Sequence, residues 1–177
     1  MVREVGQDLF PRALAKGIDL GVESSGQGML VEGNPVLLRE MVKNLMDNAI
    51  KYTPRGGSVT ARTRHAGAPI FEVEDTGEGI PEADRERVFE RFYRVLGSGA
   101  DGSGLGLPIV REIAELHRAT VSLSPNPAGQ GTVAQVVFPQ PAAAAAARAW
   151  RLLSAGLSVR CRLSMSRSVR VKKSVSC

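Results

Sequence analysis

The chain has 177 residues, 43% of them hydrophobic and 23% charged, which is the composition of a soluble globular protein with one core. It has no apolar run near the ~18 residues of a membrane span, and the opening MVREVGQDLF lacks the apolar centre of a signal peptide, so the sequence predicts a cytosolic chain. Cys161 and Cys177 both lie in the last stretch, which excludes a disulfide framework for the body.

Charge divides the chain near Pro139. Residues 1–140 carry 15 basic and 18 acidic side chains, a net charge of −3, whereas residues 141–177 carry 8 basic side chains and no acidic one. We therefore expect a folded domain over 1–139 and a basic, low-complexity, disordered tail over 140–177. The body gives no reason to expect nucleic acid as a partner, while the tail has the charge to contact acidic surfaces.

The body alternates strand and helix patterns in an order typical of an α+β protein. Short strands are predicted at 17–23 and 28–33, followed by a long helix over 34–53 with Asn34 as N-cap and Pro35 as its first residue. Alternating strands follow at 57–64 and 69–75, a helix start at 81–92, a helix at 106–117, and closing strands at 119–125 and 131–139. Strands in one layer and helices in the other give the simplest packing.

The helix over 34–53 carries a polar row beside its apolar stripe. At 3.6 residues per turn, Asn44, Asn48 and Lys51 line up next to the core-facing side, with Tyr52 at its border. Such groups need partners, because burying each one unsatisfied costs ~1–3 kcal/mol. Nearby loops are one source of partners. The other is a ligand with oxygens and a cation, since an Asn carbonyl suits Mg²⁺ and Lys suits phosphate.

Asp75 ends the predicted strand PIFEVED on its apolar side, together with Phe71 and Val73. A lone carboxylate there needs a hydrogen-bond donor. The exocyclic amine of adenine would serve, and Gly77 and Gly79 would let the backbone approach a flat ring. A turn-capping aspartate before TGEG is the alternative.

Gly102, Gly104 and Gly106 alternate just before a predicted helix, where free N–H groups and the helix dipole can cradle phosphate. Flexible loops share this pattern, and the segment is neither a dinucleotide fingerprint nor a P-loop. The preceding FERFYRVLGSGADG is typical of a hinged flap anchored by aromatic residues, or of an ordinary loop with core aromatics.

In this order the segments resemble the ATP-binding catalytic domain of bacterial sensor histidine kinases, in the superfamily shared with gyrase, Hsp90 and MutL. NLMDNAIKYT resembles the family's N box, DTGEGIP its first glycine box, FERFYR its F box and GSGLGL its second glycine box. The resemblance covers roughly residues 10–139. It implies a Bergerat-type fold, a two-layer α/β sandwich with a mixed sheet backed by helices and ATP held under a flexible lid.

The resemblance also implies a role for each matching residue. Asn48, assisted by Asn44, would coordinate Mg²⁺; Asp75 would accept from the adenine amine, supported by Thr132; and Arg91 would reach the phosphates from the lid. The implied catalytic set is Asn44, Asn48, Lys51 and Arg91. The implied ATP-binding set is Asn44, Asn48, Lys51, Tyr52, Asp75, Gly77, Gly79, Ile80, Arg91, Gly102, Ser103, Gly104, Leu105, Gly106, Leu107 and Thr132.

Such kinases transfer the γ-phosphoryl group of ATP to a histidine on a helical dimerisation domain, and from there to a response regulator. Neither His65 nor His117 stands in anything similar to the phosphoacceptor motif, and the start DLFPRALAKGIDL resembles the junction after that domain. We therefore expect a catalytic part without its own acceptor, from a parent anchored in the inner membrane with this part on the cytoplasmic side. Arg118 and Ala119 stand where the family has Gly-Gly.

Other functions stay open. ATP-hydrolysing switches of the gyrase and chaperone type carry a glutamate four residues before the metal-binding asparagine, where this chain has Asn44, a poor base. A serine kinase of the anti-sigma-factor type shares the boxes but has a more compact lid. A nucleotide sensor without catalysis, or a nucleic-acid binder acting through the tail, is a third alternative, and the tail predicts strongly salt-dependent binding.

Overall fold

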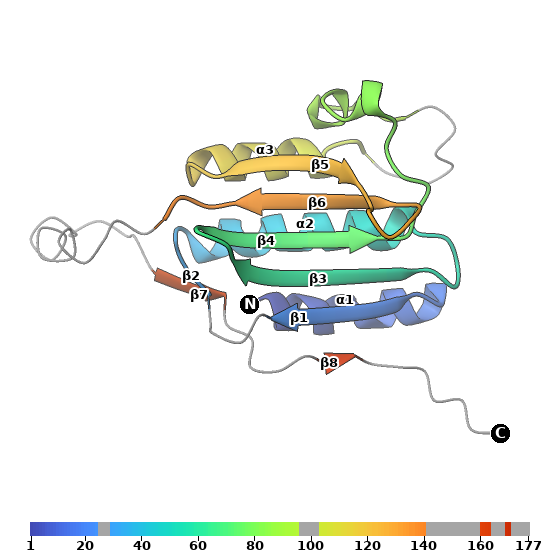
Figure 1. The fold of residues 1–177 in the computed structure, drawn as a ribbon, viewed down its shortest axis with the longest axis horizontal. Coiled ribbons are helices and arrows are strands. Elements are labelled where there is room, and N and C mark those ends of the chain that lie inside the picture. Colours follow the sequence, from blue (N-terminus) through green and yellow to red (C-terminus); the bar gives the residue numbers. More distant parts are fainter. Residues whose placement is uncertain (25–28, 96–102, 141–159, 164–168, 171–177) are drawn as a thin grey trace, which may run out of the picture.

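A computed structural model describes residues 1–24, 29–95, 103–140, 160–163 and 169–170. Within these residues the elements are α1 (Val2–Lys16), β1 (Asp19–Ser24), β2 (Met29–Glu32), α2 (Pro35–Tyr52), β3 (Ser58–His65), β4 (Pro69–Asp75), the short 3₁₀ turns η1 (Glu82–Asp84) and η2 (Arg87–Phe89), α3 (Gly106–Leu116), β5 (Thr120–Pro125), β6 (Thr132–Val137), β7 (Arg160–Leu163) and β8 (Val169–Arg170) (Figure 1).

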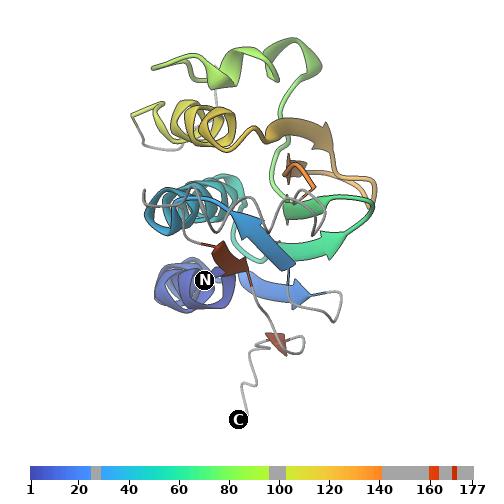
Figure 2. The same cartoon turned by 90° about the vertical axis from the view of Figure 1, so that its left-hand side faces the viewer.

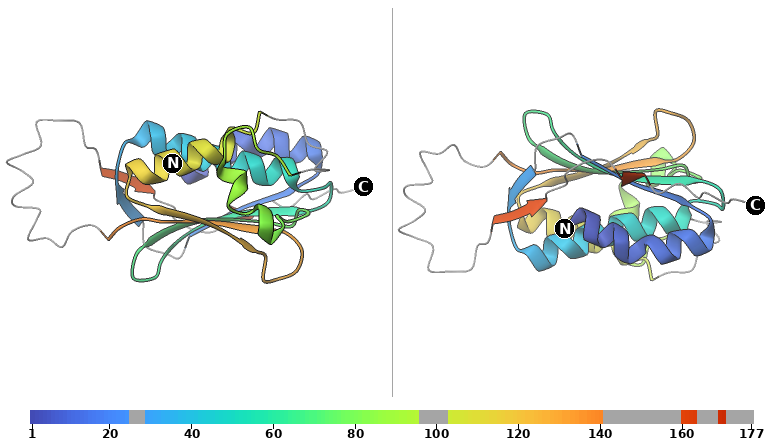
Figure 3. Two further views of the ribbon diagram at one scale, coloured as in Figure 1. Left: turned by 90° about the horizontal axis from the view of Figure 1, so that it is seen from above. Right: turned by 90° about the horizontal axis from the view of Figure 1, so that it is seen from below.

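The main sheet of the described residues has the order β5-β6-β4-β3-β1-β8. Its β5–β6, β6–β4 and β4–β3 pairs are antiparallel, whereas β1 runs parallel to β3, so the sheet is mixed. Helices α1, α2 and α3 lie side by side on one face of it, as the end-on view shows (Figure 2), and the views from above and below show the same two layers (Figure 3). The predicted two-layer α+β sandwich is confirmed.

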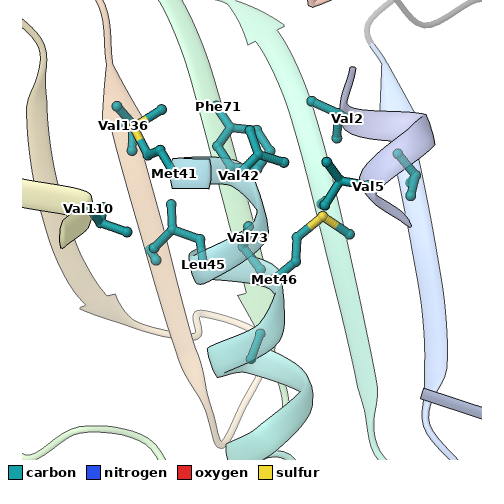
Figure 4. Packing of buried hydrophobic residues seen from close by; sticks show 14 of the residues in the cluster. Val2, Val5, Met41, Val42, Leu45, Met46, Phe71, Val73, Val110 and Val136 are labelled. Atoms are coloured by element: carbon teal, nitrogen blue, oxygen red, sulfur yellow. The ribbon is translucent and has the colours of Figure 1, made fainter. Parts of the chain in front are cut away.

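Helix α2 lies at the centre of the core because one side of it is entirely apolar. The predicted cap is present, since the side chain of Asn34 accepts from the N–H groups of Val36 and Leu37. Figure 4 shows the α2 side chains Met41, Val42, Leu45 and Met46 packed between strand residues Phe71, Val73 and Val136, with Val2 and Val5 of α1 and Val110 of α3 at the sides.

Helix α1 is an element that the sequence reasoning missed. Gly6 and Pro11 interrupt its pattern, although Val2, Val5, Leu9 and Ala13 are buried at helical spacing and carried the signal. Pro11 is exposed, so the carbonyl that it leaves without an N–H partner can be hydrated.

The other difference in the body concerns residues 81–92, where a helix start was expected and two 3₁₀ turns stand. The chain cannot continue as a helix there, because Phe92 has φ 66° and its N–H donates to the Gly104 carbonyl at 3.1 Å.

Two short strands of the basic tail lie at sheet edges, although no regular structure was expected after residue 139. Strand β7 pairs with β2 in a separate two-stranded sheet, and β8 pairs with β1. The division into a domain over 1–139 and a tail over 140–177 stays a prediction. Among the described residues, no helix is both long and apolar enough to span a bilayer.

Candidate functional site

A cavity of about 770 Å³ opens between the C-terminal half of α2, the end of β4, the start of α3 and the β5–β6 loop. This volume is in the range of small-molecule sites. Its lining brings together twelve of the predicted residues: Asn44, Asn48, Lys51, Tyr52, Asp75, Gly79, Ile80, Ser103, Gly104, Gly106, Leu107 and Thr132. Gly77, Leu105 and Arg91 are not part of the lining, and Gly102 lies outside the described residues.

Asp75 marks one end of the cavity. Its Oδ1 accepts from the N–H of Gly77 at 2.8 Å and from the N–H of Thr132 at 3.1 Å. Burial raises the pKa of Asp75 above its ordinary value, and the two backbone hydrogen bonds oppose that rise. Because both bonds end on Oδ1, Oδ2 is the acceptor that stays available to a ligand within the described part of the chain.

The loops around Asp75 meet so closely that only glycine fits at their contacts. A Cβ on Gly131 would lie 1.9 Å from the Asp75 carbonyl oxygen, and one on Gly77 would lie 2.7 Å from the Tyr52 carbonyl oxygen. Gly79 has φ 81° and faces Gly131. Gly77 therefore supports the carboxylate from outside the lining. The lining beside it includes apolar side chains (Val73, Ile80, Leu123 and Ala134), which suit a flat ring.

The other end of the cavity lies where α3 begins above the polar row of α2. A Cβ on Gly106 would be 3.0 Å from Nδ2 of Asn48 and 3.5 Å from Oδ1 of Asn44, so a glycine allows the helix start to approach both amides. The first N–H groups of a helix have no partner within the helix and carry its positive dipole end, which attracts anions.

The amide of Asn44 is oriented by its own helix. Its Nδ2 donates to the carbonyl oxygen of Glu40 at 3.0 Å and to the Glu40 carboxylate at 3.1 Å, so that among the described residues Oδ1 is left as an available ligand atom. The ammonium of Lys51 lies 4.9 Å from the centre of the Tyr52 ring, and both residues belong to the lining. Amide oxygens and a cation thus share this end, which suits a phosphate–metal pair.

The segment between the two glycine boxes is anchored at its described end. The Tyr93 hydroxyl donates to Asp84 at 2.5 Å, and the Arg87 guanidinium stacks over the Tyr93 ring at 4.4 Å. A Cβ on Gly104 would lie 2.9 Å from Cα of Phe92, so this glycine, with φ 70°, packs directly against the segment. The expected hinged flap includes residues 96–102, which lie outside the described residues.

Arg91 is not brought to the cavity. Its guanidinium donates to the Glu112 carboxylate of α3 at 2.5 Å, and the two side chains are 67% and 54% exposed. Arg94 belongs to the lining instead. The role of Arg91 at the phosphates stays a prediction, because no contact among the described residues holds its side chain there.

Helix α1 and the β5–β6 loop contribute lining residues that the sequence reasoning did not assign. Arg12 of α1 lines the cavity and pairs with Asp47 of α2, and Gln130 and Gly131 come from the loop NPAGQG. The apolar period of α1 was the signal for Arg12. Gln130 and Gly131 had no local signal, because the place of their loop depends on how β6 pairs with β4.

The two histidines of the chain lie away from the cavity lining. His65 is the exposed last residue of β3. His117 follows the last residue of α3 and caps that helix. Neither is placed to receive a phosphoryl group from a ligand in the cavity.

A sequence profile described as "Histidine kinase-, DNA gyrase B-, and HSP90-like ATPase" matches residues 33–142. The chain is similar to the sensor protein kinase PmrB of Pseudomonas aeruginosa, with 37% identity over 79% of the chain and 29% of that protein. It is also similar to the sensor protein QseC of Salmonella typhi, with 41% identity over 69% of the chain and 26% of that protein. The chain thus spans less than a third of these relatives.

Solved structures of sensor histidine kinases share the fold of this chain. A mycobacterial sensor histidine kinase, MprB, is 32% identical with a TM-score of 0.66 over 78% of this chain and 95% of that one. Full-length ShkA in complex with AMPPNP is 30% identical with a TM-score of 0.68, over 78% of this chain and 29% of that one.

Proposed function

Because the chain belongs to the family of histidine kinase-, DNA gyrase B- and HSP90-like ATPases, we propose that it binds ATP with Mg²⁺ and supplies the γ-phosphoryl group to a histidine on a separate helical dimerisation domain. One observation carries the proposal. A single cavity joins a half-buried carboxylate at one end, Asp75, with two amides under a helix start at the other, Asn44 and Asn48.

Adenine fits the Asp75 end. Oδ2 of Asp75 accepts from the exocyclic amine, and the side chains of Ile80 and Leu123 offer apolar contact to the ring. The carboxylate is held for this task, since Gly77 and Thr132 donate to its other oxygen. Guanine carries an acceptor where adenine carries its amine, so the site should discriminate against GTP.

The triphosphate fits the opposite end, under the N-terminus of α3. Asn48, with Asn44, would hold Mg²⁺, an ion that usually takes oxygen ligands and keeps several waters. Bound Mg²⁺ neutralises charge that develops on the phosphates. Lys51 adds a cation from α2, and Ser103 and Gly104, just before α3, also belong to the lining.

The chain's own residues position ATP and exclude water rather than supply a nucleophile. Phosphoryl transfer of this kind depends mainly on alignment and electrostatics. The acceptor must come from another domain, because His65 and His117 lie away from the cavity lining.

An ATPase switch is the second candidate, and the residues before Asn48 weigh against it. A hydrolytic base is expected four residues before the metal-binding asparagine, and Asn44 occupies that position. Glu40 lies one turn earlier, is not among the described lining residues, and accepts a hydrogen bond from Asn44.

Partners and location follow from the same proposal. The partner would be a histidine-bearing helical domain and, through it, a response regulator. The parent protein would be anchored in the inner membrane with this part in the cytoplasm. Residues 140–177 would form a separate basic tail able to contact acidic surfaces.

Calorimetric titration with ATP, with and without Mg²⁺ and with GTP as control, tests binding. Transfer is tested by incubating the chain with radiolabelled ATP and the separately produced helical domain of the QseC relative, with an acceptor His→Ala variant as control. Acid-labile label on the histidine supports the kinase, whereas acid-stable label supports a serine kinase. Phosphate release without label transfer supports the ATPase switch.

A further inference from the structure

The C-terminal end of α3 is fastened to the N-terminal end of α2 by the imidazole of His117. Its Nε2 accepts from the backbone N–H of Asn34 at 3.0 Å, and its Nδ1 lies 2.6 Å from the carbonyl oxygen of Ile113. Because Nε2 faces a donor and Nδ1 faces an acceptor, the two contacts fit the tautomer with its proton on Nδ1. One side chain thus joins two helices through directional bonds.

The contact with His117 requires glycine at the position before Asn34. A Cβ on Gly33 would lie 2.3 Å from Cδ2 and 2.6 Å from Nε2 of His117, so only glycine lets the imidazole approach. Asn34 uses its side chain to cap α2 and its backbone N–H to bind His117. Both residues of the turn before α2, Gly33 and Asn34, therefore contact the imidazole of His117.

The nucleotide cavity lies at the opposite end of both helices. There the start of α3 at Gly106 rests on the amides of Asn44 and Asn48, while His117 meets Asn34 at the other end. The two helices are thus antiparallel neighbours, and 11 residues of α3, about 16 Å, separate the two contacts.

Apolar packing holds α3 against α2, and Val110 and Ile113 are buried in the shared core. The hydrophobic effect itself is non-directional, so a directional contact between the two helices adds a constraint that burial alone does not supply. The hydrogen bond from the Asn34 N–H to Nε2 of His117 has direction and ties the end of α3 to the start of α2, while the contact of Nδ1 with Ile113 orients the ring. A shift of α3 along its axis would move the N–H groups at Gly106 relative to the amides below.

We propose that His117 is a positioning residue, which sets the place of α3 so that its N-terminus faces the phosphates of the nucleotide. The proposal rests on the proposed function, because it assumes that phosphates lie under α3. It assigns a task to a histidine that touches neither the nucleotide nor the acceptor. It also explains why glycine precedes the cap of α2.

The test compares ATP–Mg²⁺ with adenosine, which lacks the phosphates, by calorimetry on the full chain. His117→Ala and Gly33→Ala should each weaken ATP binding about tenfold and change adenosine binding less than twofold. A displaced α3 would lose one or two hydrogen bonds from its N-terminal N–H groups to the phosphates, which adenosine lacks. His117→Gln keeps an acceptor for the Asn34 N–H and should recover part of the loss. His65→Ala, which changes the other histidine, is the matched control.

A purely structural role predicts a different result. Thermal stability would then fall in His117→Ala while the ratio of ATP to adenosine affinity stays that of the wild type, and this overturns the proposal. If His117→Ala does not fold, the same ratio in Gly33→Ala and His117→Gln decides. If the wild-type chain binds adenosine but gains nothing from the phosphates, the proposed function itself fails.

Imidazole ¹⁵N shifts give a readout that needs no nucleotide. The free chain should show His117 as the tautomer protonated on Nδ1. The other tautomer, or exchange between the two, would contradict the bonds to Asn34 and Ile113.

Discussion

Replacing Asp75 by asparagine tests the adenine end of the cavity, because the change keeps the size of the side chain and removes its charge. Gly77 and Thr132 donate to Oδ1 at 2.8 and 3.1 Å, so the asparagine carbonyl should take the Oδ1 place and keep both bonds. The amide nitrogen then takes the place of Oδ2. A donor would face the amine of adenine, which is also a donor.

The expected loss follows from hydrogen-bond energies. A hydrogen bond to a charged group contributes about 1.5–3 kcal/mol, and a donor facing a donor adds a desolvation cost of similar order. We expect a loss of about 2 kcal/mol in ATP binding, or about thirtyfold in Kd. GTP should not lose affinity, because guanine presents a carbonyl oxygen to which the new amide can donate.

Calorimetry with ATP, ADP and GTP measures the change. Glu74→Gln is the matched control, since Glu74 neighbours Asp75 on β4 but pairs with Arg62 and is not part of the cavity lining. That variant should bind all three nucleotides as the wild type does. Thermal unfolding of each variant checks that the fold is intact.

An equal loss for ATP and GTP would refute the reasoning, because it would mean that Asp75 supports the loops rather than reads the base. Unchanged ATP affinity would refute it as well. In that case the hydrogen bonds from Gly77 and Thr132 would be the whole role of the carboxylate, as in a turn-capping aspartate.

Four further outcomes are expected. Asn48→Ala should abolish the Mg²⁺-dependent part of ATP binding, measured by titration with and without the ion, with little change in melting temperature, because this half-buried side chain borders the core. Gly131→Ala should destabilise the fold by about 3 kcal/mol or more in urea unfolding, since its Cβ would lie 1.9 Å from a carbonyl oxygen at φ 127°. Asn34→Ala should cost about 1 kcal/mol through loss of the α2 cap, and unchanged stability would contradict the two cap bonds. Burial raises the pKa of Asp75 above 3.8, so the contribution of this group to stability is present below pH 3.8 and is lost as pH rises through the raised pKa. The free energy of unfolding of Asp75→Asn should therefore rise relative to that of the wild type across this window, as measured by denaturation at several pH values.

The sequence specified the local features of the site because they depend on short periods. The 3.6-residue period placed Asn44 and Asn48 in one row beside the core of α2, and the two-residue period placed Asp75 on the apolar face of β4. The N-cap at Asn34 was predicted from neighbouring residues and is confirmed. The family's boxes, in their order, then tied the row, the carboxylate and the glycines to one ligand.

Other features could not be read locally because they join residues far apart in the chain. Glycine is required at Gly131 by the Asp75 carbonyl, 56 positions away, and Arg12 reaches the cavity because α1 packs beside α2. The ion pair of Arg91 with Glu112 on α3 likewise joins residues 21 positions apart.

The sequence thus determined which residues are predicted to bind a nucleotide, because helix and strand periods and glycine positions are local properties. Only the tertiary structure decided how those residues are held. The contact of His117 with Asn34 spans 83 positions and exists because α2 and α3 pack antiparallel on one face of the sheet. Packing direction is set by the whole core, so no short segment of the sequence carries it.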